Sequence, residues 1–227
     1  MKIFVVGVRG RMGQEIAKLI RKNKQLTFVG GLARDPQGLI VNSFEDIKTA
    51  PNVVIDFSSP DLFRKTLEWC LDHKVAFLSG TTGLTESDFK KLKSAGKKIP
   101  ILWTANTSIG IQIMKDLLTS LPLPKTYKVQ LTEWHHIHKK DKPSGTAIVL
   151  QNILDQKRKQ LPAPRSIRKG EIVGTHRLVL SSLEEEIEIE HKALKRAVFA
   201  KGAVEVAQWL KRQKPGCYQM EDYVKSL

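Results

Sequence analysis

The densest group of residues able to do chemistry lies near the middle of the chain, between Glu133 and Ala147. Three of the six histidines, His135, His136 and His138, fall within four residues, and Lys139 follows them directly. Imidazole exchanges protons near neutral pH, whereas a lysine ammonium supplies fixed positive charge. The composition of this run therefore indicates proton transfer beside a cationic binding group.

The end of the same run predicts a helix that begins at the site. Ser144 is a natural N-cap, and a helix is expected from about Thr146 to Lys159. The backbone N–H groups of Gly145, Thr146 and Ala147 would then point at whatever lies before the helix, where an anion is favoured. A proton donor, a lysine and a helix N-terminus together describe a pocket for a small acidic substrate that gains or loses a proton.

Two other interpretations of this run stay open from its residues alone. The three histidines with Glu133 could ligate a metal ion, although the adjacent lysines raise the electrostatic cost of placing a cation there. The run could also be a solvated basic loop, because clusters of histidine and lysine are often only surface. We favour the proton-transfer site and predict no metal.

A second segment with binding chemistry, Gly7 to Gly13, follows a predicted buried strand and opens a predicted helix. Glycines permit a tight turn and a close approach of backbone N–H groups, so a pyrophosphate can sit at the helix N-terminus. The spacing departs from Gly-x-Gly-x-x-Gly, since an arginine stands where the middle glycine is expected, and a turn that binds nothing is the alternative. The predicted cofactor contacts in this loop are Gly7, Arg9, Gly10, Arg11 and Met12.

The residues after the second predicted strand bear on which dinucleotide is bound. An acidic residue there would bind the ribose 2′-hydroxyl of NAD, whereas an arginine suits a 2′-phosphate. Ala33-Arg34 occupies this place, and Arg9 and Arg11 add positive charge nearby. NADPH is therefore the expected cofactor, with NADH as the alternative, although Arg34 could equally be an ordinary surface charge.

Turn residues follow three further predicted strands, at Asp56 to Ser58, Gly80 to Gly83 and Thr104 to Thr107. Each alone is ordinary turn chemistry. Because the carboxyl ends of parallel strands meet at one edge of a sheet, where α/β proteins bind ligands, we expect these turns to complete the cofactor crevice. The further predicted cofactor contacts are Gly80, Thr81, Thr82, Thr104, Ala105, Asn106 and Thr107.

The elements that must position these residues fall into two groups. The first hundred residues alternate short apolar strands with amphipathic helices, which predicts an α/β fold with a mostly parallel, doubly wound sheet. After Asn106 the pattern changes to α+β, with strands that include two of period-two alternation. The expected strands are 3–7, 26–32, 53–57, 75–78, 99–103, 127–132, 176–181 and 185–190, and the later helices are 109–121, 146–159 and 200–212.

Composition limits the class of protein. The chain has 227 residues of which 41% are hydrophobic, and it carries a formal net charge of +15 spread along its length rather than in one block. A folded protein is expected, and a nucleic-acid surface is disfavoured. The early apolar run is too short for a signal peptide or a membrane span, and the two cysteines, Cys70 and Cys217, suit a reducing, cytoplasmic compartment.

The central run resembles the signature of the 4-hydroxy-tetrahydrodipicolinate reductase family, once called dihydrodipicolinate reductase. The matching residues are Glu133-x-His135-His136-x-His138-Lys139 and Pro143-Ser144-Gly145-Thr146-Ala147. The resemblance extends through nearly the whole chain. It includes Gly7 to Gly13, Asp56 to Ser58, Gly80 to Gly83, Gly170 to His176 and Arg196 to Ala203.

The resemblance implies an NAD(P)H-dependent enzyme that reduces 4-hydroxy-tetrahydrodipicolinate to tetrahydrodipicolinate with loss of water, in diaminopimelate and lysine synthesis. It implies a Rossmann-type dinucleotide-binding domain in residues 1–107 and 196–227. Residues 108–195 would form an α+β domain with an open mixed sheet that binds the substrate, a small dicarboxylate, and makes a homotetramer. The alternatives are another dehydrogenase of small amino or sugar acids, and a basic cofactor-sensing or nucleic-acid-binding module on the same fold.

The resemblance also assigns residue roles. His135 matches the family's proton donor and acceptor, and Lys139 matches its proton-donating, substrate-holding lysine. The implied substrate contacts are His136, Ser144, Gly145 and Thr146. Two positions depart from the family pattern. Ala33 stands where members that use NADH well often carry an acidic residue, which strengthens the NADPH preference, and Thr107 replaces a common phenylalanine beside the nicotinamide.

Overall fold

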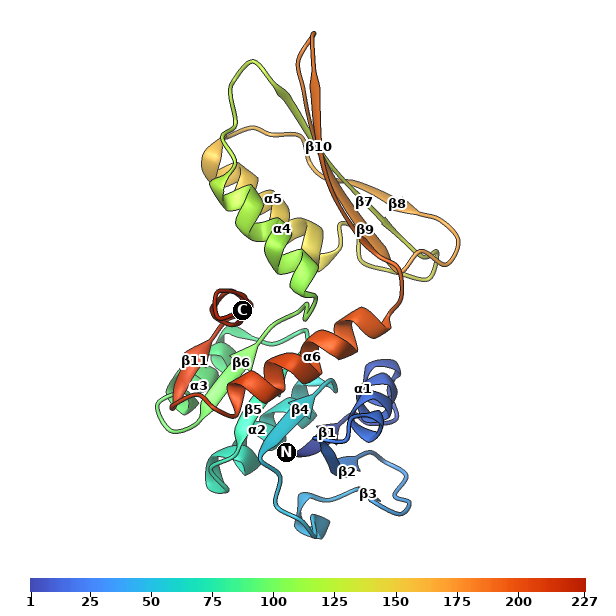
Figure 1. Ribbon diagram of the computed structural model, residues 1–227, viewed down its shortest axis with the longest axis vertical. Helices are drawn as coiled ribbons and strands as arrows, with labels where there is room; N and C mark the ends of the chain where they lie inside the picture. The colour runs from blue at the N-terminus through green and yellow to red at the C-terminus, as the bar shows by residue number, and fades with distance from the viewer. The chain divides into compact units, whose positions relative to one another are not determined.

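The computed structural model describes residues 1–227, and these form two compact units. The first unit comprises Met1–Ser108 and Phe199–Leu227, and the second comprises Ile109–Val198. Each unit has its own sheet and its own helices (Figure 1).

The first unit is a seven-stranded, all-parallel sheet in the order β11-β6-β5-β4-β1-β2-β3. Its central strands are continuous apolar runs buried on both faces, as parallel strands between helices must be. The predicted doubly wound Rossmann-type fold is confirmed. The strands are β1 (Lys2–Val6), β2 (Thr27–Leu32), β3 (Ile40–Val41), β4 (Val53–Asp56), β5 (Ala76–Ser79), β6 (Pro100–Trp103) and β11 (Gly216–Tyr218).

The helices of this unit begin where the sequence places their signals. Pro60 is the first residue of α2, and Thr85 and Asp88 form a capping box at the start of α3, each side chain bonding the other's backbone N–H. These caps set the helix starts just beyond the carboxyl ends of the preceding strands. The helices are α1 (Arg11–Lys22), α2 (Pro60–Asp72), α3 (Glu86–Ala95), α6 (Ala197–Leu210), α7 (Met220–Val224) and the 3₁₀ turn η1 (Phe44–Asp46).

The second unit is a four-stranded mixed sheet in the order β10-β9-β7-β8, in which β8 is parallel to β7 and the other pairs are antiparallel. Two helices cover one face of this sheet (Figure 1), and leucines such as Leu118, Leu131, Leu150 and Leu178 form the core between them. The predicted open mixed sheet is confirmed. The elements are α4 (Ile109–Ser120), β7 (Lys128–His135), α5 (Gly145–Lys157), β8 (Arg165–Arg168), β9 (Gly174–Ser181) and β10 (Glu186–Ala193).

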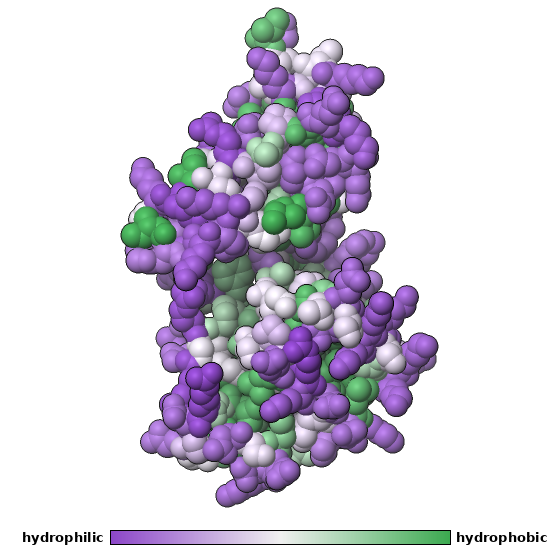
Figure 2. Space-filling model, turned by 180° about the vertical axis from the view of Figure 1, so that it is seen from behind, coloured by the Kyte–Doolittle hydropathy of each residue, from purple (hydrophilic) through white to green (hydrophobic).

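The surface is rich in charge. Hydrophilic side chains dominate the face drawn in Figure 2, and apolar residues appear there in small groups. None of the helices combines the length and the apolar character that a membrane crossing requires.

Candidate functional site

The site in the second unit is built on two neighbouring strands. Alternation along β7 places Glu133 and His135 on the buried side of the sheet and Trp134 on the other. The parallel pairing with β8 sets Ser166 beside Glu133 and Arg168 beside His135. Side chains separated by more than 30 positions in the sequence thus meet at the carboxyl end of β7.

Glu133 and His135 form a buried pair. The Nδ1 atom of His135 bonds to Oε2 of Glu133, and the two residues are 8% and 0% exposed. The other carboxylate oxygen of Glu133 lies 2.9 Å from Nη1 of Arg168 and accepts the backbone N–H of Ser144 at 3.4 Å. The carboxylate therefore connects the histidine, an arginine and the start of α5.

The electrostatics of this pair fix its protonation. Burial raises the pKa of Glu133, but its interactions with Ser166, His135 and Arg168 outweigh burial and hold that pKa below its ordinary value. Burial lowers the pKa of His135, and the charges of Lys139 and Arg168 add to this effect against the opposing pull of Glu133. At neutral pH the carboxylate is ionised, and a neutral imidazole donates Nδ1–H to it.

The second ring nitrogen of His135 lies against a glycine. A Cβ atom at Gly174 would come within 3.0 Å of Nε2, so the absence of a side chain leaves this atom room. With the proton on Nδ1, Nε2 holds the lone pair. This geometry is compatible with proton exchange at Nε2, the role that the sequence predicts for His135.

Lys139 lies in the loop after β7, where its Nζ atom is 2.8 Å from Oδ1 of Asp141. The carboxyl group of Asp141 also accepts the backbone N–H of Gly145, the first residue of α5. Burial raises the pKa of Asp141, but Lys139 and backbone hydrogen bonds, including that from Gly145, outweigh burial and hold the pKa below its ordinary value. Asp141 therefore occupies Lys139 and the Gly145 N–H, both expected to bind a substrate carboxylate, and this interaction was not predicted from the sequence.

Ser144 is the N-cap of α5, as predicted, and its hydroxyl accepts the N–H of Ala147 at 3.2 Å. The expectation that all three first N–H groups face a ligand is therefore wrong for Ala147, because the cap satisfies it. Thr146 is half-buried in the first turn. The same hydroxyl of Ser144 lies 3.3 Å from Nε2 of His176, a buried histidine on β9 that was not among the predicted site residues.

The remaining histidines lie outside the buried pair. His136 and His138 have ring centroids 6.1 Å apart, and exposed His138 lies 3.9 Å from Glu171. Burial, with the charge of His135 next, lowers the pKa of His176 to about 3, so this imidazole is neutral at ordinary pH. The structure contains no group of three or more His, Cys, Asp or Glu side chains arranged to hold a metal ion.

The first unit gathers the predicted cofactor residues along the carboxyl edge of its sheet. Strand order reverses direction between β1 and β4, the place at which open α/β sheets bind ligands. The turn after β1 packs tightly, since Gly7 has φ of +75° and a Cβ there would lie 2.3 Å from the carbonyl oxygen of Phe57. A Cβ at Gly13 would lie 2.2 Å from the carbonyl oxygen of Gly7. Only glycine fits at these two positions.

The start of α1 suits an anion. Its N-cap, Gly10, has no side chain to cap the helix, and the first turn contains no acidic residue but begins with Arg11. Met12 is half-buried beside it. The N-terminal amides and the helix dipole therefore face outward without a competing carboxylate, and a dinucleotide pyrophosphate fits this arrangement.

Two of the predicted contacts use their side chains elsewhere. The guanidinium of Arg9 donates to the backbone carbonyl of Asp35 at 3.0 and 3.1 Å, which ties the glycine-rich loop to the segment after β2. Thr107 is buried and its hydroxyl donates to the carbonyl of Phe199 at 2.7 Å, so its side chain anchors α6 instead of facing a ligand. The backbone carbonyl of Thr107 also lies close to α6, because Gly202 has no side chain there.

The other turns at this edge are organised by Asp56. This carboxylate is fully buried and accepts hydroxyl protons from Ser58, Ser79 and Thr81, and burial raises its pKa. A Cβ at Gly80 would lie 2.2 Å from the ring of Phe57, so these turns interlock. The exposed residues beyond them are Thr82 and Ala105, while Thr104 and Asn106 bond to each other across a short turn.

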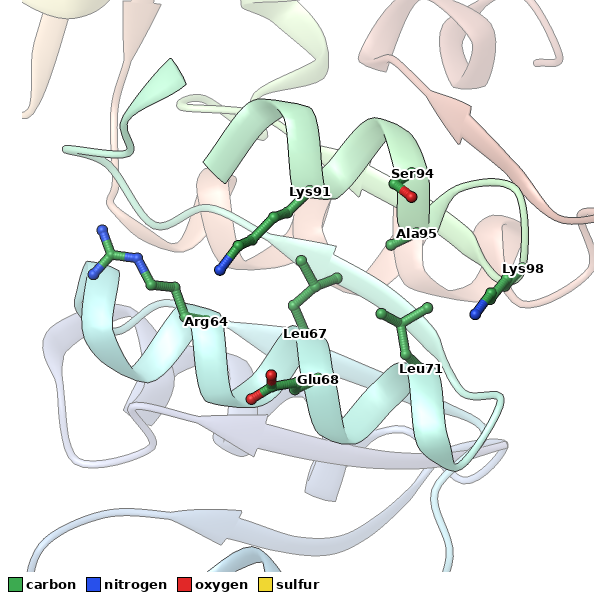
Figure 3. Close-up of a pocket in the computed structure, with 8 residues that line it drawn as sticks. All are labelled: Arg64, Leu67, Glu68, Leu71, Lys91, Ser94, Ala95 and Lys98. Carbon is green, nitrogen blue, oxygen red and sulfur yellow. The ribbon is translucent and has the colours of Figure 1, made fainter. Parts of the chain in front are cut away.

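Arg34 is exposed and lines a cavity of about 350 Å³ with Lys65, Ser59 and Asn42, next to Ala33. A different cavity lies between α2 and α3 (Figure 3), lined by Leu67, Leu71 and charged residues that include Arg64. Arg64 is already bonded to Asp88 at 2.7 Å. The first cavity lies at the carboxyl edge and the second does not contain any predicted site residue.

A parallel sheet with a glycine-rich turn at its switch point is typical of proteins that bind pyridine nucleotides. Here it is combined in one chain with a unit that carries a carboxylate-oriented histidine and a lysine. The class of protein defined by this combination is the NAD(P)H-dependent oxidoreductases.

Comparison with known proteins narrows the class. Residues 1–107 match the family described as dihydrodipicolinate reductase, N-terminus, and residues 108–224 match its C-terminus. The 4-hydroxy-tetrahydrodipicolinate reductase of Bdellovibrio bacteriovorus is 40% identical over 98% of this chain and 95% of its own length. That of Thermosipho africanus is 37% identical over 99% and 98%. The chain belongs to the dihydrodipicolinate reductase family.

Solved structures agree on the fold. A dipicolinate-bound dihydrodipicolinate reductase from Paenisporosarcina sp. TG-14 superimposes with a TM-score of 0.83, at 19% identity and with 98% of both chains covered. Myo-inositol 2-dehydrogenase from Lactobacillus plantarum matches more distantly, with a TM-score of 0.63 and 9% identity over 100% of this chain and 94% of that one. The two-unit architecture is thus shared beyond the family.

Proposed function

We propose that this chain reduces 4-hydroxy-tetrahydrodipicolinate to tetrahydrodipicolinate with NAD(P)H and releases water, a step in diaminopimelate and lysine biosynthesis. The observation that carries the proposal is the placement of His135, Lys139 and the start of α5 around the end of β7, in a chain of this family. The names of the relatives and the dipicolinate bound to the structural neighbour support a small dicarboxylate as the substrate.

In this proposal each group at the site has one task. His135 accepts and donates the proton at Nε2, because Nδ1 is engaged by Glu133. Lys139 and the N-terminus of α5 hold a substrate carboxylate, which orients the ring for reduction. Bound NAD(P)H supplies the hydride. The further substrate contacts are His136, Ser144, Gly145 and Thr146.

The two activities are assigned to different parts of the chain. Residues 1–107 and 196–227 bind the dinucleotide, supported by the narrow turn at Gly7 and Gly13 and the uncapped start of α1. Residues 108–195 bind the substrate and form the subunit interface. These limits lie within three residues of the two compact units.

NADPH is the proposed preferred cofactor, with NADH as the weaker alternative. The cavity beside Ala33 contains two cations, Arg34 and Lys65, and hydrogen-bonding groups on Ser59 and Asn42. Its one carboxylate, that of Asp61, is paired with Arg64 at 2.8 Å. A 2′-phosphate adds about two negative charges and three acceptor oxygens, so this lining favours the phosphorylated ribose. Arg34 was predicted from the sequence as a cofactor contact, whereas Lys65 was not.

We also propose a homotetramer in the cytoplasm. The support for assembly is the face of the mixed sheet that α4 and α5 leave uncovered (Figure 1), where Arg177 stacks on Trp134 at 5.1 Å and pairs with Glu188 and Glu190. Light scattering after gel filtration should give a mass near four times 25.6 kDa. A monomer at micromolar concentration would contradict this part of the proposal.

The test of the reaction is NADPH and NADH oxidation by purified chain, with substrate made in place from pyruvate and aspartate semialdehyde by the preceding synthase. We expect oxidation that requires the synthase, is faster with NADPH, and falls at least about 100-fold in His135→Ala. The matched control is His73→Ala, which removes a histidine from the end of α2. A folded chain that raises its melting temperature with NADPH and yet oxidises neither cofactor would refute the assigned reaction and favour a sensor or another dehydrogenase.

A further inference from the structure

Glu133 has more partners than a structural carboxylate needs. One oxygen bonds to Nδ1 of His135, the other pairs with Arg168 at 2.9 Å, and the second oxygen also accepts the Ser144 N–H. The side chain of Glu133 is completely buried and that of Arg168 is 7% exposed. Burying a charge pair this deeply is costly, so its partners indicate what it does.

Arg168 binds the loop that carries Lys139, the lysine proposed to hold the substrate. Its Nε atom donates to the backbone carbonyl of Lys139 at 3.2 Å, and its Nη2 atom donates to that of Asp141. Its Nη1 atom faces Glu133. The planar guanidinium thus connects the histidine's carboxylate on one side with the lysine loop on the other.

We propose that Glu133 and Arg168 are positioning residues of the reductase site. Glu133 fixes the proton of His135 on Nδ1 and leaves Nε2 as the atom that exchanges protons with the substrate. Arg168 keeps Glu133 ionised and holds the Lys139 loop at a set distance from the histidine. The assignment rests on the proposed function, in which His135 and Lys139 do the chemistry.

The isosteric variant Glu133→Gln keeps the size of the side chain and changes only which atoms of residue 133 accept or donate hydrogen bonds. Arg168 has only donors, so the amide oxygen of the glutamine must face it. The amide NH₂ then faces Nδ1 of His135, which becomes an acceptor, and the imidazole proton moves to Nε2. The ring stays in place but presents a donor where the neutral wild-type site presents a lone pair.

Arg168→Lys tests the role proposed for Arg168. A lysine keeps the positive charge beside Glu133 but cannot donate to Glu133 and to both loop carbonyls in the geometry of the planar fork. We expect the proton of His135 to stay on Nδ1 while the Lys139 loop loosens. Binding of a dicarboxylate should weaken at least fivefold, with a smaller effect on kcat than Glu133→Gln has.

The experiment compares the full-length wild type, both variants and the control Glu86→Gln, which makes the same chemical change at an exposed position at the start of α3. ¹⁵N spectra of histidine-labelled protein at pH 8 report the ring proton, with His135→Asn used for assignment. Calorimetry of dipicolinate binding tests the role of Arg168 in holding the Lys139 loop. NADPH turnover tests the role of Glu133 in setting the tautomer of His135. We expect the Nδ1–H form in the wild type, the Nε2–H form in Glu133→Gln, and a loss in kcat of about 100-fold with dipicolinate affinity changed less than threefold.

The outcomes separate the two proposals. An Nε2–H tautomer in the wild type overturns the role of Glu133 even if Glu133→Gln fails to fold, because that measurement needs no variant of Glu133. Equal losses of kcat and dipicolinate affinity in Glu133→Gln would also overturn it, since they would indicate a general structural role. A wild type with the Nδ1–H form and no turnover would refute the proposed function while leaving the control of the tautomer by Glu133 in place.

Discussion

Asp141 is predicted to compete with the substrate for Lys139. In the structure its carboxylate pairs with Nζ of Lys139 at 2.8 Å and accepts the N–H of Gly145, the two groups proposed to bind a substrate carboxylate. Replacing Asp141 with Asn removes the charge and keeps an oxygen that can accept the Gly145 N–H. The variant should therefore bind a dicarboxylate more tightly than the wild type does.

The size of the effect follows from exposure. The side chains of Lys139 and Asp141 are 25% and 54% exposed. Pairs at such exposure contribute about 0.2–1 kcal/mol, far less than a buried pair does. If that interaction must be given up on binding, removing it tightens binding by about 1.4- to fivefold.

Isothermal titration with dipicolinate measures this change directly, and KM for the reductase substrate should fall in parallel. The control is Asp155→Asn, which removes one negative charge from α5, where Asp155 bonds only to Gln151 among the side chains around it. Equal gains in both variants would reflect net charge alone. Weaker binding in Asp141→Asn, with Asp155→Asn unchanged, would refute the competition and would mean that Asp141 helps to hold the ligand.

Three further predictions follow from the structure. Replacing Arg34 and Lys65 with Ala should raise KM for NADPH about tenfold and leave KM for NADH, the internal control, within twofold, because only the 2′-phosphate loses charge-assisted bonds. His176 has a folded pKa of about 3 against 6.5 for the ordinary side chain, so between these values the unfolded chain binds the extra proton and the folded state loses stability as pH falls. Urea titrations should therefore show that the free energy of unfolding falls by about 2 kcal/mol more in the wild type than in His176→Asn between pH 6.5 and pH 4.5. Equal losses in the two proteins would contradict this prediction. Ala at position 202 would place Cβ 1.8 Å from the carbonyl oxygen of Thr107, so Gly202→Ala should lower the free energy of unfolding by about 1–3 kcal/mol, and an unchanged Tm would refute this.

The long elements were predictable because pattern and caps agreed. The apolar runs of β1 and β4, the capping box at Thr85 and the N-cap at Ser144 each mark a boundary by local chemistry, and the structure has them there. The elements missed were β3, η1, β8, β11 and α7, none longer than five residues. Such short elements are stabilised mainly by the neighbours they pair with, and sequence periodicity does not report those neighbours.

The candidate site shows the same division between local and distant information. The types and spacing of His135, Lys139 and Ser144 indicated proton transfer beside an anion, because these residues are close in sequence. Asp141 lies in the same run of sequence, but its competition with a ligand could not be predicted, because only the fold of the loop brings its carboxylate to Lys139 and Gly145. The use of Thr107 to anchor α6 depends on Phe199, 92 positions away.

The clearest example is β8, whose sequence Arg-Ser-Ile-Arg has no strong strand pattern and follows a proline-rich segment. Its parallel register with β7 places Ser166 and Arg168 beside Glu133 and His135. A shift of that register by one residue would turn Arg168 to the opposite face and leave Glu133 buried without its counter-charge. The charge pair therefore specifies the register of an otherwise weak strand, and in return the strand supplies the arginine that we propose holds the catalytic groups. In the proposed mechanism, stability and chemistry at this site depend on the same ion pair. Its removal must therefore be followed by the tautomer of His135 as well as by activity.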